Sequence, residues 1–187
     1  KGAFLGPAYS QPDIERRLGA AGAKFASVSD EDIIDLGARA LADGKALGWH
    51  QGRMEFGPRA LGGRSILGDA RSPSMQRMLN LKVKYRESFR PFAPAVLRED
   101  VADWFDLDGD SPYMLLVYPV SERQRQPTPA AGEVRGIDKL KVQRSTIPAV
   151  THVDYSARVQ TVEACRAPLY HRLISAFHAK TGCPVVI

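Results

Sequence analysis

Two basic segments in the first half of the chain contain the residues best suited to bind an anion. The first, MEFGPRALGGRSILGDAR (54–71), has three arginines and four glycines, with no lysine and only two acids. Glycine weakens helices, and arginines on a helix surface usually alternate with carboxylates, so this segment is expected to form a loop. The guanidinium groups of Arg59, Arg64 and Arg71 can then point at an anion.

The second segment, LKVKYRESFRPFAP (81–94), places Lys84, Arg86 and Arg90 at spacings of two and four. If residues 83–86 are extended, Lys84 and Arg86 point to the same face. Two neighbouring cations repel each other unless an anion lies between them. The point charge of lysine and the two-pronged guanidinium of arginine suit a phosphate or a carbamoyl oxygen.

Simpler interpretations exist for both segments. The first could be a glycine-rich turn with arginines facing solvent, and the second a solvated basic face. Against the latter, Phe89, Pro91 and Phe92 place Arg90 in apolar surroundings that a solvated face does not need. Neither segment is a Walker loop or a G-x-G-x-x-G fingerprint. The four histidines lie in no metal-binding motif, so no metal ligands are predicted in this chain.

The charge distribution narrows the class of ligand. The chain has 187 residues, 44% hydrophobic and 25% charged, as expected of one globular domain, and its net charge is +5. Residues 53–98 contain ten basic and three acidic residues, so this segment accounts for the whole excess. A modest excess suits either a nucleic-acid surface or a pocket for phosphorylated small molecules. A nucleic-acid face would spread its cations widely, so their concentration in a segment constrained by glycine and proline favours a cleft.

Cellular context follows from cysteine use and hydropathy. No apolar run approaches the ~20 residues that cross a bilayer. Cys165 and Cys183 are in neither a C-x-x-C nor a zinc spacing. They are interpreted as two reduced, partly buried thiols of a cytoplasmic protein, with a single disulfide between them as the alternative. The sequence leaves the oligomeric state open, a homodimer included.

These candidate ligands must be positioned by a mixture of helices and strands. Helix signals occur at residues 12–22, at 29–44 between Ser29 as N-cap and Gly44, at 72–84 with Ser72 as N-cap, and at 168–182 ending at Gly182. The expected buried faces are Ile33, Gly37, Ala40 and Leu41 in the second helix, and Leu169, Leu173, Ala176 and Phe177 in the last.

Strands are expected at 45–52, at 113–120, 147–154, 156–162 and 184–187, and a short one is expected within 90–100. Residues 121–147 are polar, contain prolines and have no sustained period, so they are expected to form a long loop, a candidate lid. Helices and strands that alternate in this way predict an α/β or α+β fold.

The two basic segments together resemble a known family. GRMEFGPRALGGRSILGDAR followed by LNLKVKYRESFRPFAPAVL resembles the C-terminal domain of the carbamoyltransferases, which include nodulation-factor carbamoyltransferases and O-carbamoyltransferases of antibiotic biosynthesis. HVDYSARVQTV and TGCPVVI are similar to later segments of that domain, and FLGPAYSQPDIE is similar to the inter-domain junction. The resemblance therefore divides the chain into a linker at 1–11 and a domain at 12–187.

The resemblance implies a YrdC-like domain, a twisted mixed β-sheet flanked by helices. It also implies that the domain takes ATP, with Mg²⁺, and carbamoyl phosphate as co-substrate, forms carbamoyl-adenylate and releases pyrophosphate. A separate N-terminal domain of the actin-like kinase superfamily, which is expected to hold iron, then transfers the carbamoyl group to an acceptor hydroxyl. That domain is absent from this sequence and is the expected partner of the chain.

The resemblance also assigns roles to individual residues. Lys84 and Arg86 match a K-x-R pair that YrdC-like domains use on phosphates, and they are predicted to be catalytic. Arg90 and Arg158 are expected to bind the substrate and nucleotide as well. Arg59 and the backbone N–H groups at 57–61 are expected to complete this site or to contact the missing domain. No general base is needed, because the attacking carbamate oxygen is already anionic. The alternatives are an RNA-binding YrdC-like module and a non-catalytic docking domain.

Two positions depart from the pattern of the family. The strand PVVI is expected to continue into an asparagine-threonine-serine-phenylalanine-asparagine segment, but the sequence stops at Ile187, so the domain is expected to be truncated. Tyr155 stands where the resemblance leads us to expect glycine. Because glycine adopts a left-handed turn readily and tyrosine does not, the type of turn at this position is left open.

Overall fold

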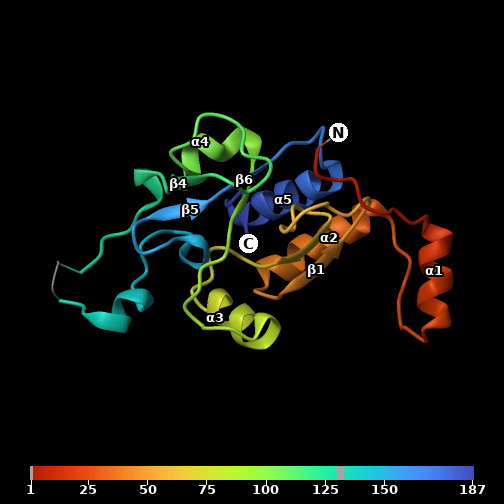
Figure 1. The fold of residues 1–187 in the computed structure, drawn as a ribbon, viewed down its shortest axis with the longest axis horizontal. Helices are drawn as coiled ribbons and strands as arrows, with labels where there is room; N and C mark the ends of the chain where they lie inside the picture. The colour runs from red at the N-terminus through yellow and green to blue at the C-terminus, as the bar shows by residue number, and fades with distance from the viewer. Residues whose placement is uncertain (1, 130–132) are drawn as a thin grey trace.

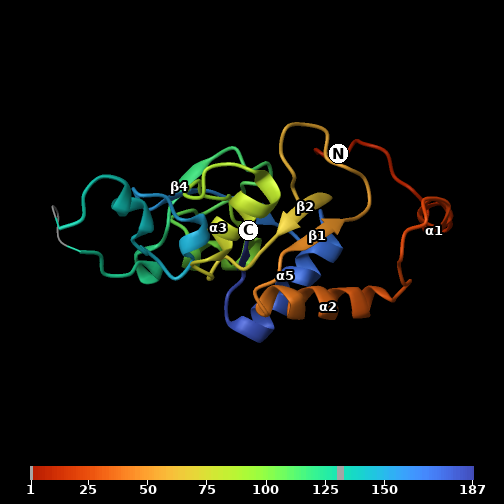
Figure 2. The ribbon, with the colours of Figure 1, turned by 90° about the horizontal axis from the view of Figure 1, so that it is seen from below.

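The hydrophobic core lies where two helices pack against each other and against short strands. The structure is a computed structural model that describes residues 2–129 and 133–187. Helix α2 (Asp30–Ala42) lies along helix α5 (Pro168–Thr181), and Figure 2 shows the two side by side beneath strand β1 (Leu47–His50).

Helix α2 begins as predicted but faces the core differently. The Ser29 hydroxyl accepts a hydrogen bond from the Asp32 backbone N–H at 3.1 Å, which confirms the N-cap. The prediction that Ile33 and Ala40 belong to the buried face is wrong, since Ile33 is 43% exposed and Ala40 is only partly buried. The buried residues are Ile34, Gly37, Ala38 and Leu41. The two adjacent isoleucines gave the sequence two possible helix faces, and packing against α5 selects one.

Helix α5 ends where the sequence indicates. Gly182 adopts the left-handed conformation with φ of 72°, and its N–H donates to the carbonyl of His178. Leu173 and Phe177 are buried as expected, whereas Leu169 and Ala176 are only partly buried. The other buried residues of the helix are Tyr170 and Ile174.

The strands form small ladders that join into a mixed arrangement. Strand β1 pairs antiparallel with β2 (Arg64–Leu67). Strand β3 (Ala95–Leu97) lies between β6 (Gln160–Val162), to which it is parallel, and β7 (Val185–Val186), to which it is antiparallel. The backbone N–H of Ile187 donates to the carbonyl of Gly68 at 2.9 Å, which connects β7 to the end of β2. The α/β class expected from the sequence is confirmed.

A third ladder pairs β4 (Val117–Pro119) with β5 (Ser156–Arg158) in antiparallel register. The predicted strand at 113–120 is therefore shorter than expected, because Met114 has a positive φ of 54° and breaks the extended run. Tyr155 also has a positive φ, 64°, so the turn before β5 is left-handed although no glycine is present.

Two other predictions of secondary structure are wrong. The strand expected at 147–154 is instead a short 3₁₀ turn, η5 (Pro148–Val150). The helix expected from Ser72 begins later, as α3 (Met75–Leu79), and has no side-chain cap. It then widens into a π-helical turn, η1 (Asn80–Lys84). Two further short elements precede β4: the 3₁₀ turn η2 (Arg98–Asp100) and helix α4 (Val101–Trp104).

Two peripheral segments lie at opposite ends of the molecule (Figure 1). Helix α1 (Gln11–Ala20) starts one residue before the predicted boundary, has no buried residue and projects from the body. The segment 121–147 contains the 3₁₀ turns η3 (Glu122–Gln124) and η4 (Gly136–Lys141), and its residues 130–132 lie outside the described residues. Its role as a lid stays a prediction. Among the described residues, no helix has the length and apolarity needed to cross a membrane.

Candidate anion site

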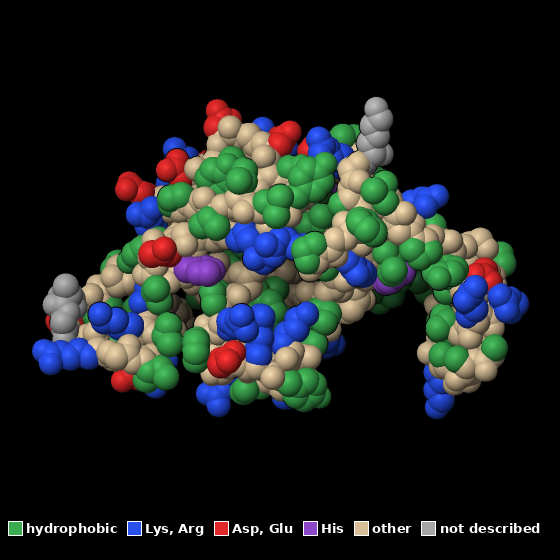
Figure 3. Space-filling model, viewed as in Figure 1, with side chains coloured by type: hydrophobic (Ala, Val, Ile, Leu, Met, Phe, Trp, Pro, Cys, Tyr) green, Lys and Arg blue, Asp and Glu red, His purple; other side chains and the backbone are tan. Residues whose placement is uncertain are grey.

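Four of the five predicted site residues line one hollow of about 330 Å³, which we call the cationic hollow. These residues are Arg59, Lys84, Arg86 and Arg158. They come from the loop between β1 and β2, the end of η1, the residues just after it, and the end of β5. Figure 3 shows Lys and Arg side chains on both sides of a cleft at the centre of the face. No aspartate or glutamate is among the lining residues.

The loop that carries Arg59 is fixed by one buried carboxylate. Oε1 of Glu55 accepts hydrogen bonds from the backbone N–H groups of Leu61, at 2.6 Å, and Gly63, at 2.5 Å. Gly62 has φ of 104°, and a Cβ there would lie 2.3 Å from the ring of Tyr170. The glycines of this segment therefore serve close packing and a left-handed backbone. The backbone N–H of Leu61 was expected to be available to a ligand, but it already donates to Glu55 and is not available.

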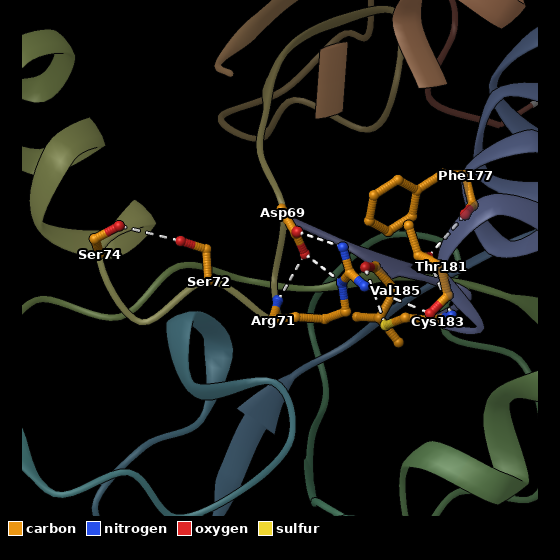
Figure 4. A network of polar contacts seen from close by, with 8 residues as sticks. All are labelled: Asp69, Arg71, Ser72, Ser74, Phe177, Thr181, Cys183 and Val185. Carbon is orange, nitrogen blue, oxygen red and sulfur yellow. Dashed lines mark hydrogen bonds and ion pairs between the residues drawn. The ribbon is translucent and has the colours of Figure 1, made fainter. Parts of the chain in front are cut away.

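The other two arginines of the first segment are structural, so the expectation that they point at an anion is wrong. Arg64 Nε lies 3.2 Å from Glu55 Oε2. Arg71 donates to both carboxylate oxygens of Asp69, at 3.0 Å from Nε and 2.8 Å from Nη2, as Figure 4 shows. Only Arg59 of the three lines the cationic hollow.

Arg59 and Arg158 bring two guanidinium groups together without a carboxylate. Burial and the charge of Arg59 lower the pKa of Arg158. The Nε atoms of both residues are buried and have no hydrogen-bond partner within residues 2–129 and 133–187. A buried donor without an acceptor is unfavourable by about 1–3 kcal/mol. An anion in the hollow would supply the missing acceptors.

Arg86 is held by a neutral side chain. Its Nε donates to Oδ1 of the buried Asn80 at 2.6 Å, and its guanidinium lies 4.8 Å from the centre of the Phe92 ring. Burial lowers the pKa of Arg86, and the charge of Arg90 lowers it further. A guanidinium nevertheless stays protonated at neutral pH. The residue therefore contributes a full positive charge to the hollow.

Lys84 and Arg86 reach the hollow by a route that the sequence did not indicate. Residues 83–86 are not extended, since η1 runs to Lys84. Tyr85 then adopts a left-handed conformation, with φ of 49° and ψ of 50°. Both cations still line the hollow, because this turn reverses the chain between them.

Arg90 is the predicted residue that the structure does not place with the others. It is absent from the lining of the cationic hollow and forms an ion pair of 3.8 Å with Glu87, with each side chain 59% exposed. The apolar neighbour expected to surround it, Phe92, packs against Arg86 instead. Its assignment to the site has no geometric support.

Sequence reasoning missed two buried polar residues that shape the site. Asn80 is fully buried, and Gln160, which also lines the hollow, donates from Nε2 to the carbonyl of Leu61 at 2.8 Å. The signal for Asn80 was present: it is the polar residue inside the apolar run M-L-N-L. A polar residue in the buried stripe of a helix needs partners, and those partners can be functional side chains.

Neither cysteine lines the cationic hollow. Cys183 is buried and Cys165 is exposed, and both are free. Burial raises the pKa of Cys183 to about 12. Among the described residues, no group of three or more His, Cys, Asp or Glu side chains could hold a metal ion.

Comparison with known proteins places these residues in a family. Residues 38–187 match the family model described as the carbamoyltransferase C-terminus. An uncharacterized protein of Synechocystis sp. is 53% identical over 189 residues, covering 100% of this chain and 31% of that protein. Nodulation protein NolO of Bradyrhizobium diazoefficiens is 42% identical over 160 residues, 84% of this chain and 26% of the relative.

A further relative is named as an O-carbamoyltransferase. The 3'-hydroxymethylcephem-O-carbamoyltransferase of Streptomyces clavuligerus is 41% identical over 147 residues, or 79% of this chain and 24% of the relative. The chain thus spans less than a third of the length of these curated relatives. The family model covers both basic segments and every residue that lines the cationic hollow, and the chain belongs to the carbamoyltransferase C-terminal family.

Proposed function

We propose that the chain binds carbamoyl phosphate and ATP in the cationic hollow, as part of an ATP-dependent O-carbamoyltransferase. One observation carries the proposal: Arg59, Lys84, Arg86 and Arg158 converge on one hollow whose lining includes no aspartate or glutamate side chain. Unneutralised cations at close range favour a polyanionic ligand. The relatives named as carbamoyltransferases supply the chemical class of that ligand.

The proposed reaction needs charge neutralisation rather than a general base. Water attacks the phosphorus of carbamoyl phosphate, the bond from that phosphorus to the carbamoyl oxygen breaks, and carbamate leaves as an anion while the phosphate keeps both protons of the water. An anionic carbamate oxygen then attacks the α-phosphorus of ATP, which forms a new P–O bond. The bond from that phosphorus to the β-phosphate oxygen breaks, and pyrophosphate leaves as carbamoyl-adenylate forms. The residues that line the hollow include no Asp, Glu or His, which agrees with chemistry driven by electrostatics and positioning.

The cations divide into two proposed roles. Lys84 and Arg86 lie on either side of the left-handed residue Tyr85, and we assign them to the triphosphate, where they neutralise the departing pyrophosphate. Arg59 and Arg158, whose Nε donors lack partners, are assigned to carbamoyl phosphate. The lining of the hollow offers Mg²⁺ no aspartate or glutamate side chain, so the expected Mg²⁺ would be held by the nucleotide phosphates and water.

The transfer to an acceptor hydroxyl belongs to another part of such a protein. The relatives are more than three times as long as the matched region, which leaves room for the expected actin-like, iron-dependent N-terminal domain. The choice of acceptor would lie there. The RNA-binding alternative has less support, because the cations line a hollow instead of covering a broad face.

The test is calorimetric titration with carbamoyl phosphate and with α,β-methylene-ATP. Wild-type protein should bind both saturably, and Arg86→Ala should weaken binding by about 30-fold, the scale of one lost charge-assisted contact. Arg77→Ala is the matched control, since Arg77 is an exposed arginine of α3 outside the hollow. Absence of saturable binding to folded wild-type protein, or equal weakening by both substitutions, would overturn the proposal.

A further inference from the structure

Asn80 is a fully buried amide whose polar atoms are all engaged. Its Oδ1 accepts from Arg86 Nε at 2.6 Å. Its Nδ2 donates to the carbonyl oxygens of Arg90, at 2.8 Å, and Ser88, at 3.2 Å. A buried amide is unfavourable unless its hydrogen bonds are made, and here each one is made to the segment that carries Arg86. Asn80 thus connects the start of η1 to residues up to ten positions later.

The backbone of Asn80 holds the same segment. Its carbonyl oxygen accepts from the N–H groups of Tyr85 and Arg86, the latter at 3.1 Å. Tyr85 is left-handed, a conformation that is unfavourable by roughly 1–2 kcal/mol for a residue with a side chain. The Tyr85 side chain is 86% exposed, so its own packing does not hold this turn. The bonds to Asn80 are what fix it.

These contacts determine how Arg86 presents its charge. Asn80 occupies the Nε donor, and the Phe92 ring, 4.8 Å from the guanidinium, fixes its plane. No acceptor for the terminal Nη groups of Arg86 is found among the described residues. Paired Nη–H donors in a fixed plane suit two oxygens of one phosphate. Because an amide is neutral, it orients the guanidinium without cancelling its charge.

We infer that Asn80 is a positioning residue, which aims the Nη groups of Arg86 at a phosphate oxygen of the substrate in the cationic hollow. This inference rests on the proposed function. Asn80 itself is not among the residues that line the hollow, so it acts through Arg86. A carboxylate in the same place could accept from the same Nε, but it would neutralise the arginine and lose the two hydrogen bonds that Nδ2 donates to Ser88 and Arg90.

A double-mutant cycle tests the inference with carbamoyl phosphate as the titrated ligand. Asn80→Ala should lower affinity about 10-fold and Arg86→Ala about 30-fold. The double variant should bind no more weakly than Arg86→Ala alone, because the two residues form one unit. Asn80 does not act through Arg86 if Asn80→Ala weakens binding by the same factor in wild-type protein and in Arg86→Ala. The same conclusion holds if Asn80→Ala weakens binding in neither protein. Wild-type protein that fails to bind would instead refute the proposed function.

A second measurement uses the native Asn80, since Asn80→Ala removes the donor to two carbonyl oxygens and could unfold the protein. Nitrogen-15 NMR can follow the Nε–H of Arg86, assigned by its loss in Arg86→Lys. Its hydrogen exchange should be at least 10-fold slower than that of the exposed Arg77, because Asn80 accepts its bond. Equal exchange rates for the two arginines would overturn the inference, whether or not the hollow binds carbamoyl phosphate.

Discussion

Arg71 and Arg86 are anchored by the same device in two parts of the molecule, with one difference. Each donates through Nε to a side-chain Oδ1, at 3.0 Å for Arg71 and 2.6 Å for Arg86. Each lies over a phenylalanine ring, Phe177 at 5.4 Å and Phe92 at 4.8 Å. The acceptor is an aspartate for Arg71 and an asparagine for Arg86.

This difference separates a structural arginine from a candidate binding residue. Hydrogen bonds to Asp69 raise the pKa of Arg71, and a third contact, to the Thr181 carbonyl, further occupies the guanidinium (Figure 4). Burial lowers the pKa of Arg86, which has no carboxylate partner of its own in the hollow. The partner of an arginine, more than its position in a basic segment, decides whether it is available to a ligand.

The largest expected effect comes from giving Arg86 the partner of Arg71. Asn80→Asp places a carboxylate on the Arg86 Nε, cancels its charge and adds an anion near the hollow. Affinity for carbamoyl phosphate should fall about 100-fold, or about 2.7 kcal/mol, in calorimetric titration. Unchanged affinity in folded Asn80→Asp protein would show that the charge of Arg86 is not used by the ligand.

Replacing the aspartate partner of Arg71 by asparagine should lower the stability of the fold and leave the binding of carbamoyl phosphate intact. Asp69 is 5% exposed, and Asp69→Asn leaves the guanidinium of Arg71 without a charged partner. We expect the free energy of unfolding in urea to fall by about 2 kcal/mol, reduced from the value for a fully buried pair because Arg71 is partly exposed. Under conditions in which essentially all of the protein is folded, the affinity for carbamoyl phosphate should change less than twofold. A stability loss below about 0.5 kcal/mol, the range of ordinary surface substitutions, would contradict the structural role.

The sequence predicted the elements better than the contacts within them. Ser29 and Gly182 mark helix ends through local backbone chemistry, so their roles could be predicted without tertiary information. The core face of α2 could not, because Ile33 and Ile34 each complete a plausible helical stripe and only the contact with α5 distinguishes them.

The site was predicted in part for a similar reason. Residue type identified Arg59, Lys84, Arg86 and Arg158, and the structure brings them together. Residue type alone did not show that Glu55 neutralises Arg64 or that Asp69 neutralises Arg71, since those ion pairs depend on how the loop folds. The left-handed turn at Tyr85 was also not predictable, because the bonds from Asn80 impose it against the preference of the residue.

The pH dependence of the free energy of unfolding tests the region around Arg71, the structural arginine of the comparison, because Cys183 lies near it. Burial raises the pKa of this thiol to about 12, so the folded protein holds the proton more tightly than the unfolded chain, whose thiol titrates near 8.5. The stabilisation is complete below that unfolded value and is lost as pH rises toward the folded value.

Between pH 8 and 9.5 the free energy of unfolding should therefore fall by about 1 kcal/mol. Urea unfolding at several pH values measures this slope. Cys183→Ala is the control: it lowers stability at every pH through the lost packing but should remove this part of the slope. An identical slope in both proteins would mean that Cys183 is not protected from ionisation by burial.

The smallest effect is expected at Arg90, where sequence and structure disagree. Its ion pair with Glu87 is long and exposed. Arg90 does not line the hollow, and it affects the hollow through the electrostatic effect of its charge on Arg86. Exposed pairs contribute little, and their fields are screened beyond about 10 Å at 0.1 M salt. Arg90→Ala should thus weaken carbamoyl phosphate binding less than twofold, and the change should vanish at high salt. A loss as large as that of Arg86→Ala, persisting in salt, would instead mean that the ligand draws Arg90 into the site, and that the neutral anchor on Asn80 is not what selects the binding arginine.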